Sequence, residues 1–262
     1  MNVLVLLSII LFVLMKSISG EKGTKSFIAL FLNFGITLLT ILLIAKGIGD
    51  PIFLTLIACT IISCINLFYI NTINLKSMIA FISTMITLLF LVIVIFFIVE
   101  KANIQGFGIE EIEELSFFNL YVGIDFLKIA ISTIIMGSIG AITDTAISIA
   151  SAMNEIWLHN PKLSRSDLFK SGMNVGKDIL STTTNTLYFA FIGGYLALLL
   201  WFNDLSYSLG EVINSKVFSS EVISIFCIGT GAILVIPITA WLTAYIFTKY
   251  KKEFPVNESA SE

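Results

Sequence analysis

Long apolar segments separated by short polar ones dominate the sequence. A helix needs roughly 20 predominantly apolar residues to cross a bilayer, and seven segments reach or approach this length. They cover about residues 2–19, 27–45, 51–70, 78–99, 127–153, 179–202 and 222–247. A membrane β-barrel would show short segments of alternating hydrophobicity instead, and the sequence has none. The pattern predicts an all-α, polytopic transmembrane bundle of about seven helices.

The polar segments are short and contain no Pro/Ser-rich linker, so we treat residues 1–262 as a single membrane domain. The two longest are 100–126 and 154–178. The first is acidic, and residues 109–120 within it predict an amphipathic surface helix. The second contains Ser-Arg-Ser-Asp at 164–167, which predicts a helix start followed by a short amphipathic helix.

Composition supports the membrane assignment. Hydrophobic residues make up 57% of the chain and charged residues only 13%, whereas soluble domains carry about 25% charged residues. The net charge of −3 identifies no partner. We expect contact with membrane lipid and none with nucleic acid.

Basic residues set the expected orientation, because short loops rich in Lys and Arg stay cytoplasmic. With the N-terminus outside and the C-terminus inside, only Lys46, Lys101 and Lys216 fall in external loops, and Lys128 lies at a helix boundary. Eleven basic residues then lie inside: Lys16, Lys22, Lys25, Lys76, Lys162, Arg165, Lys170, Lys177, Lys249, Lys251 and Lys252.

The first apolar segment has two interpretations. It could be a signal peptide, but it lacks a basic start and an Ala-x-Ala-like cleavage site. Cleavage near Gly20 would also invert every later loop and place most basic residues outside. We therefore expect an uncleaved first helix, which is short for a membrane span.

Few residues suggest catalysis or metal binding. Cys59, Cys64 and Cys227 lie within apolar segments without the spacing of a metal or redox motif, which favours a packing role. The one histidine, His159, lies in a polar loop, and a metal site needs several convergent ligands. We expect no metal, no cofactor and no enzymatic activity.

A polar stripe follows one face of the fifth predicted helix. Spacings of 4, 3, 4, 3 and 4 place its members on one side of the helix. They are Gly137, Ala141, Asp144, Ser148, Ser151 and Glu155. Small residues and hydroxyls are typical of contacts between membrane helices, so we expect the stripe to face protein.

Asp144 is the least expected residue of this stripe. It precedes Glu155 by eleven residues, or roughly 16 Å along a helix, which places it near the bilayer midplane. A charged side chain there costs about 2.5–3.5 kcal/mol even on insertion scales. Asp144 is thus either a functional group, held neutral or in a hydrated gap, or a structural hydrogen-bond acceptor. We interpret it as the candidate proton-coupling residue.

The sixth predicted helix carries six consecutive hydroxyl or amide residues, Ser181 to Thr186. We expect these residues to pack against the stripe and to bring the Gly193–Gly194 pair against the fifth helix. Such residues could instead serve only as interhelical contacts. The candidate interface residues of this helix are Thr182, Asn185, Thr186, Gly193 and Gly194. Glu155, Lys177 and Asp178 form a group of charges at the expected cytoplasmic end.

Two motifs in this region resemble those of a known family. "GSIGAITDTAISIASAMNEI" and "SGMNVGKDILSTTTNTLYFAFIGGYLALLL" are similar to YibE/YibF-like bacterial multipass membrane proteins, over about residues 123–202. The short chain resembles the YibF-type member. The resemblance implies a bacterial plasma-membrane protein with no established substrate. It also implies work as a pair, with the long YibE-type protein or as a homo-oligomer.

A more distant resemblance links the same region to SecD/SecF and RND permeases. Asp144-Thr145, the Ser181–Thr184 run and Gly193–Gly194 stand where those helices carry similar residues. The permeases have a large external domain after their first helix, and only residues 46–50 occupy that place here. The resemblance implies a permease-like motif core at 127–202 without the external domain.

Two functional hypotheses remain open from the sequence. The first is a transporter or permease-like subunit, proton-coupled through Asp144, with an unknown substrate. The second is a non-transporting scaffold or assembly partner whose polar helices dock another membrane protein. A flux measurement on reconstituted protein would distinguish them.

Overall fold

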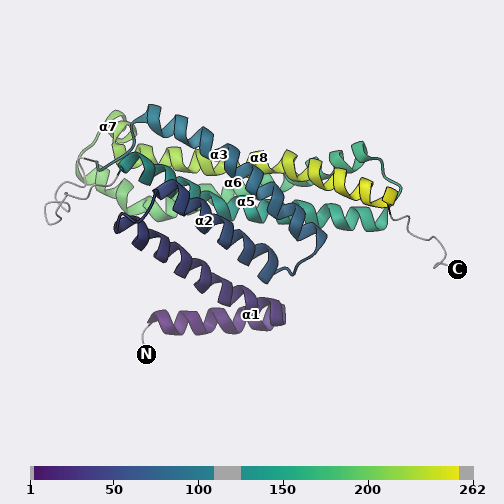
Figure 1. Cartoon of the computed structure of the whole chain (residues 1–262). Coiled ribbons are helices and arrows are strands. Elements are labelled where there is room, and N and C mark those ends of the chain that lie inside the picture. The colour runs from purple at the N-terminus through teal and green to yellow at the C-terminus, as the bar shows by residue number, and fades with distance from the viewer. Residues whose placement is uncertain (1–2, 109–124, 254–262) are drawn as a thin grey trace.

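The computed structural model describes residues 3–108 and 125–253, and these residues form helices and no strand (Figure 1). The expected helix at 109–120 lies outside the described residues. The helices are α1 (Val3–Ala45), α2 (Pro51–Cys64) with the π-helical turn η1 (Ile65–Tyr69), α3 (Leu75–Ala102), α5 (Phe126–His159), α6 (Arg165–Asp204), α7 (Leu209–Asn214) and α8 (Lys216–Glu253).

Six helical stretches of the described chain are long and apolar enough to cross a membrane: α1, α2 with η1, α3, α5, α6 and α8. The all-α, polytopic prediction is therefore confirmed. Both of the first two predicted segments lie in α1, whose 43 residues would extend roughly 65 Å if straight. Gly20, at φ 57° and ψ −126°, divides α1 into two arms. The arms fold back on each other, with 5.0 Å between the ring centres of Phe12 and Phe27.

The helix start predicted at 164–167 is confirmed, because Ser164 caps α6 and accepts a hydrogen bond from the Asp167 amide. The separate short helix predicted after it is wrong. From Arg165 to Asp204 the chain is one helix of 40 residues. Gly172 and Gly176 do not interrupt this helix, since both are buried against its neighbours.

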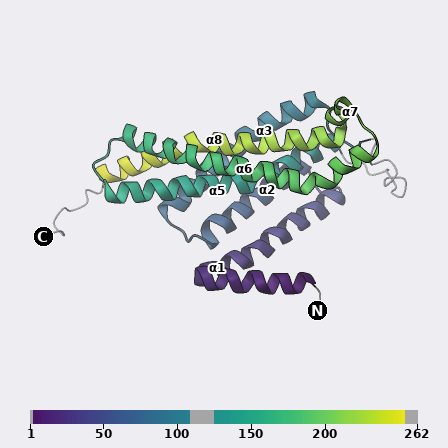
Figure 2. The same cartoon turned by 180° about the vertical axis from the view of Figure 1, so that it is seen from behind.

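The core of the bundle is built around α5, which contacts α2, α3, α6 and α8. Its buried side chains include Ile135, Ile142 and Ile149, and they pack with core residues of α3 and α8 such as Leu91 and Val235. The first arm of α1 lies at the edge of the molecule in both views (Figures 1 and 2). Of the membrane helices, α5 is therefore the best placed to present side chains to several partners.

The turns between the helices lie at two ends of the bundle. Lys22, Lys25 and Asn71 line one cavity, so the Gly20 turn and the turn after η1 share an end. At the other end Lys216 Nζ donates to the Gln105 carbonyl over 2.9 Å. We refer to these as the inner and outer ends, following the orientation predicted from the basic residues.

Candidate functional site

A groove of about 390 Å³ separates α5 from α6 near the middle of both helices. Asp144 lies in it, 18 residues after the start of α5 and 15 before its end. The groove is lined by Gly140, Ala141, Asp144, Thr145 and Ser148 of α5 and by Ile179, Thr182, Thr183, Thr186 and Leu187 of α6. The structure thus joins the predicted stripe to the predicted Thr-rich run.

The α5 wall of the groove follows from the periodicity of the helix. Ile142 and Ala146 are fully buried in the bundle core, and Asp144 and Ser148 lie exposed on the other side of the helix. Ser151 is half-buried just beyond the groove. Gly137 lines a different cavity, towards α1 and α2. The central part of the stripe therefore forms the site, and its ends do not.

The α6 wall presents mostly hydrogen-bond acceptors. Thr182 Oγ1 donates to the Ile179 carbonyl over 2.9 Å, and Thr186 Oγ1 donates to the Thr182 carbonyl over 3.0 Å. Each hydroxyl has one proton, so these two oxygens retain only lone pairs for a further partner. Where they line the groove, they can accept a proton donor or contact a cation.

Within the described residues, the Asp144 carboxyl has no hydrogen bond or ion pair, and no Lys or Arg lines the groove. A protonated carboxyl can donate to the oxygens of Thr182 or Thr186. A carboxylate can only accept, and must use hydroxyls that are not already donating, such as those of Thr145 and Ser148. The two protonation states of Asp144 therefore favour different partners in the groove.

The structure does not bring Asn185, Gly193 and Gly194 to the site. Asn185 is exposed and lies outside the groove lining, and a Cβ at either glycine would meet no atom within 4 Å. The outer half of α6 packs instead on α8, with 6.3 Å between the ring centres of Phe191 and Phe218. Among the residues that the structure describes, Gly193 and Gly194 thus do not make the expected contact with α5.

The predicted inner-end charges are exposed and do not enter the groove. Glu155, Lys177 and Asp178 all lie at the surface. The one salt bridge among the described residues joins Lys128 to Asp50 at the outer end. Across residues 3–108 and 125–253, no three His, Cys, Asp or Glu side chains come together as a metal site would require. The groove therefore offers a single carboxyl group among hydroxyls.

Several lining residues were not predicted. Gly140 and Thr145 flank the stripe at positions one turn before and one residue after Asp144, and Thr183 belongs to the run that the sequence singles out. Once Asp144 is known to line the groove, the spacing of Gly140 and Thr145 from it predicts that they lie beside it on the same helix. A second cavity between α1, α2 and α5 was also missed. Its signal is the presence of Thr37, Thr40 and Ser132 in otherwise apolar helices.

Comparison with known protein families shows the family of this chain. The model of the YibE/F-like protein family matches residues 7–249, which include every helix that forms the groove. The chain belongs to the YibE/F-like family. No curated protein and no solved structure matches it. Family membership and the six apolar helices together describe this YibE/F-like chain as a multi-pass membrane protein.

Proposed function

We propose that this YibE/F-like protein is a proton-coupled transporter or permease-like subunit of the bacterial plasma membrane, with Asp144 as the group that binds and releases the proton. The observation that supports the proposal most is the placement of Asp144. It is a carboxyl group midway along a membrane helix, exposed in a hydroxyl-lined groove without a basic partner. Intramembrane ionisable residues that face a cavity are typical of proton and substrate pathways.

The proposed cycle uses the hydrogen-bonding properties of the two walls. A protonated Asp144 donates to the acceptor oxygens of Thr182 or Thr186 and draws α6 towards α5. Loss of the proton removes this donor and leaves lone pairs facing lone pairs, which separates the helices or admits water or a cation. Gly172 packs closely on Met153 of α5 and Ala240 of α8, and Gly176 packs on Ile236 of α8, so movement of α6 would be confined to the part beyond these glycines.

A second candidate function is supported by the outer flank of α6. Asn185 is exposed there, and Gly193 and Gly194 face open space. Small and polar residues on a membrane helix are typical of helix–helix contacts. In this alternative the chain is a scaffold, and the flank binds the long YibE-type protein or a second copy of this chain.

The deciding experiment compares wild-type protein with the Asp144→Asn and Asp178→Asn variants in proteoliposomes that contain a trapped pH-sensitive dye. Asn preserves the size of Asp and most of its hydrogen bonding, but it cannot titrate. We expect proton flux from wild type and from Asp178→Asn, which changes an exposed carboxyl at the inner end, and background flux from Asp144→Asn at equal incorporation. Full flux in Asp144→Asn would end the proton-coupling proposal. Background flux from wild type as well would favour the scaffold.

A further inference from the structure

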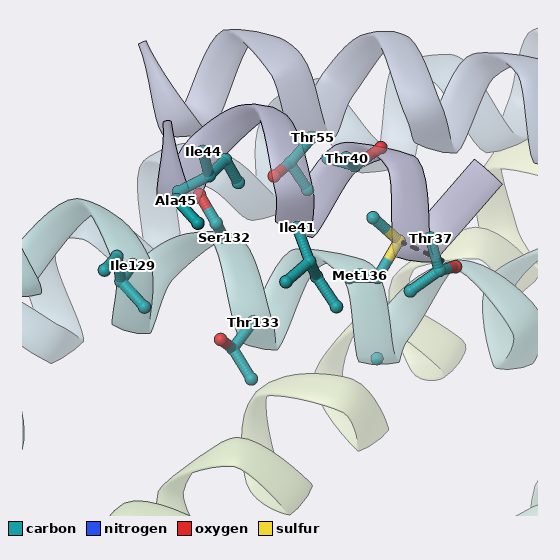
Figure 3. Close-up of a pocket in the computed structure, with 11 residues that line it drawn as sticks. Thr37, Thr40, Ile41, Ile44, Ala45, Thr55, Ile129, Ser132, Thr133 and Met136 are labelled. Atoms are coloured by element: carbon teal, nitrogen blue, oxygen red, sulfur yellow. Dashed lines mark hydrogen bonds between the residues drawn. The ribbon is translucent and has the colours of Figure 1, made fainter. Parts of the chain in front are cut away.

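A second cavity lies nearer the outer end of α5 than the Asp144 groove, between the second arm of α1, α2 and α5 (Figure 3). Its volume is about 430 Å³, which falls within the range of small-molecule sites. Most of its wall is apolar: Ile41, Ile44, Ala45, Ile129 and Met136 line it together with a few hydroxyls. The wall therefore suits an apolar ligand with a small polar group.

One buried hydroxyl in this cavity has no hydrogen-bond partner among the described residues. Ser132 is 95% buried (5% exposed), and its Oγ forms no hydrogen bond. The neighbouring hydroxyls differ, since Thr40 donates to Ile36 O and Thr55 donates to Pro51 O. Figure 3 shows the Ser132 side chain extending from α5 towards α1 and α2. A buried polar group without a partner is costly, so a ligand that accepts a hydrogen bond from this hydroxyl would remove that cost.

The depth of Ser132 in the bundle indicates the kind of ligand. It follows Lys128 by four residues, or roughly 6 Å along the helix. Lys128 Nζ lies 2.6 Å from Asp50 Oδ2, and both side chains are 41% exposed, as expected at the level of lipid headgroups. Each polar layer of a bilayer is roughly 5–8 Å thick, and the hydrocarbon begins below it. Ser132 therefore lies where the ester groups of phospholipids are found.

We propose that this cavity binds one acyl chain of a phospholipid from the leaflet at the Asp50 end. The Ser132 hydroxyl donates to the ester carbonyl of that lipid. The chain then follows α5 inwards from Ser132 past Met136 to Gly137, which also lines the cavity. From Ser132 to Gly137 the cavity spans five residues, or roughly 8 Å of helix, so it accommodates the upper part of an acyl chain.

The test uses full-length protein in vesicles of phosphatidylethanolamine and phosphatidylglycerol that contain a trace of phosphatidylglycerol with a diazirine in its acyl chain. After photolysis, mass spectrometry locates and quantifies the cross-linked residues. Three variants are compared with wild type: Ser132→Ala removes the hydroxyl, Ala45→Phe fills the cavity, and Leu42→Phe is the control. Leu42 is on the same arm of α1, 50% exposed, and does not line the cavity.

We expect wild type and Leu42→Phe to cross-link preferentially at the cavity wall, including Ile44 and Met136. Ala45→Phe should lose this labelling. Ser132→Ala should reduce it by about threefold to tenfold, which corresponds to one uncharged hydrogen bond. In lipid-free detergent Ser132→Ala should not unfold at a lower temperature than wild type, because its hydroxyl has no partner within the protein. Labelling that is equal in all four proteins, or spread over the outward-facing apolar side chains, would overturn the proposal.

Discussion

Asp144 and Glu155 belong to one helical stripe, and their surroundings separate their roles. Asp144 lies between two walls of hydroxyl groups in the middle of the bundle. Glu155 is exposed at the inner end of α5 and forms no salt bridge among the described residues. A carboxyl that is solvated in both protonation states cannot couple a proton to a helix movement. We therefore assign the proposed titrating role to Asp144 and not to Glu155.

Glu155→Gln is expected to be mild. Exposed charges contribute about 0–1 kcal/mol to stability, so the variant should fold normally and retain proton flux within about twofold of wild type. Flux and thermal unfolding are measured beside Asp144→Asn in one vesicle preparation. Loss of flux equal to that of Asp144→Asn would move the coupling role towards the inner end of the stripe.

At the scale of the element, α6 is a helix with two different environments. In its inner part a Cβ at Gly176 would overlap the Cγ2 methyl of Ile236, whereas in its outer part Gly193 faces open space. Arg165 strengthens the inner attachment, with its guanidinium 4.6 Å from the ring centre of Tyr245 on α8. The inner part is therefore closely packed at Gly176, and the proposed change in distance from α5 is expected in the part of α6 beyond it.

The same substitution at these two glycines should have opposite effects. Gly176→Ala introduces a methyl where Ile236 already packs, and overpacking of this kind costs about 1–3 kcal/mol. Gly193→Ala meets no atom and removes a residue of low helix propensity, so stability should stay unchanged or rise by up to about 1 kcal/mol. Thermal unfolding in one detergent measures both. Equal loss in the two variants would contradict this description of α6.

A charge contact joins α2 to α5 at the outer end. Hydrogen bonding to Lys128 lowers the pKa of Asp50 below its ordinary value, so the ionised form stabilises the folded state. The contribution is present above the ordinary pKa of about 4 and is lost as pH falls through the lowered value in the folded protein. Because both side chains are 41% exposed, solvent screening limits it to about 0–1 kcal/mol.

Asp50→Asn tests this contact without removing the helix cap, because Asn also caps helices well. At pH 7 the variant should unfold at a slightly lower temperature than wild type. The difference should shrink as the pH is lowered below about 4, where wild-type Asp50 also becomes protonated. A difference that is constant over this pH range would show that the cap, and not the charge, determines the effect.

The sequence predicts the elements better than it predicts their contacts. Apolar length is enough to locate the spans, and the spacing around Asp144 is enough to identify one groove wall. The run from Ser181 to Thr186, however, extends around more than a full turn, so only part of it can face α5. Which part does so depends on the rotation of α6, and this is set by close packing of Gly172 and Gly176 with residues far away in the sequence.

The Gly20 turn is a similar case. Two apolar segments separated by a short basic stretch predict two helices, and the structure has two arms with a sharp change of direction at one residue. The cavity beside Ser132 was not predicted, because it depends on how α1, α2 and α5 diverge. The hydroxyls of Thr37, Thr40 and Ser132 mark its wall in the sequence, but they do not give the distance between the three helices.

At the scale of the whole molecule, successive membrane helices end alternately at the outer and inner ends. Residues at these two ends give a test of orientation. Leu209, 81% exposed, begins α7 at the outer end. Asn160, also exposed, follows α5 at the inner end. In a background without Cys59, Cys64 and Cys227, Leu209→Cys should react with an impermeant maleimide in intact cells. Asn160→Cys should react only after permeabilisation. Reaction of both in intact cells would contradict the orientation predicted from the basic residues.

The exposure of Asp144 in a groove between only two helices has a consequence for the minimal working unit. The chain supplies the α5 and α6 walls of the groove, and the remaining side comes from the environment. If that side is lipid, turnover per molecule is independent of protein density and depends on bilayer composition. If it is a second protein, turnover per molecule falls on dilution in the membrane. The dependence of turnover per molecule on protein density in the membrane therefore shows whether lipid or a second protein completes the groove.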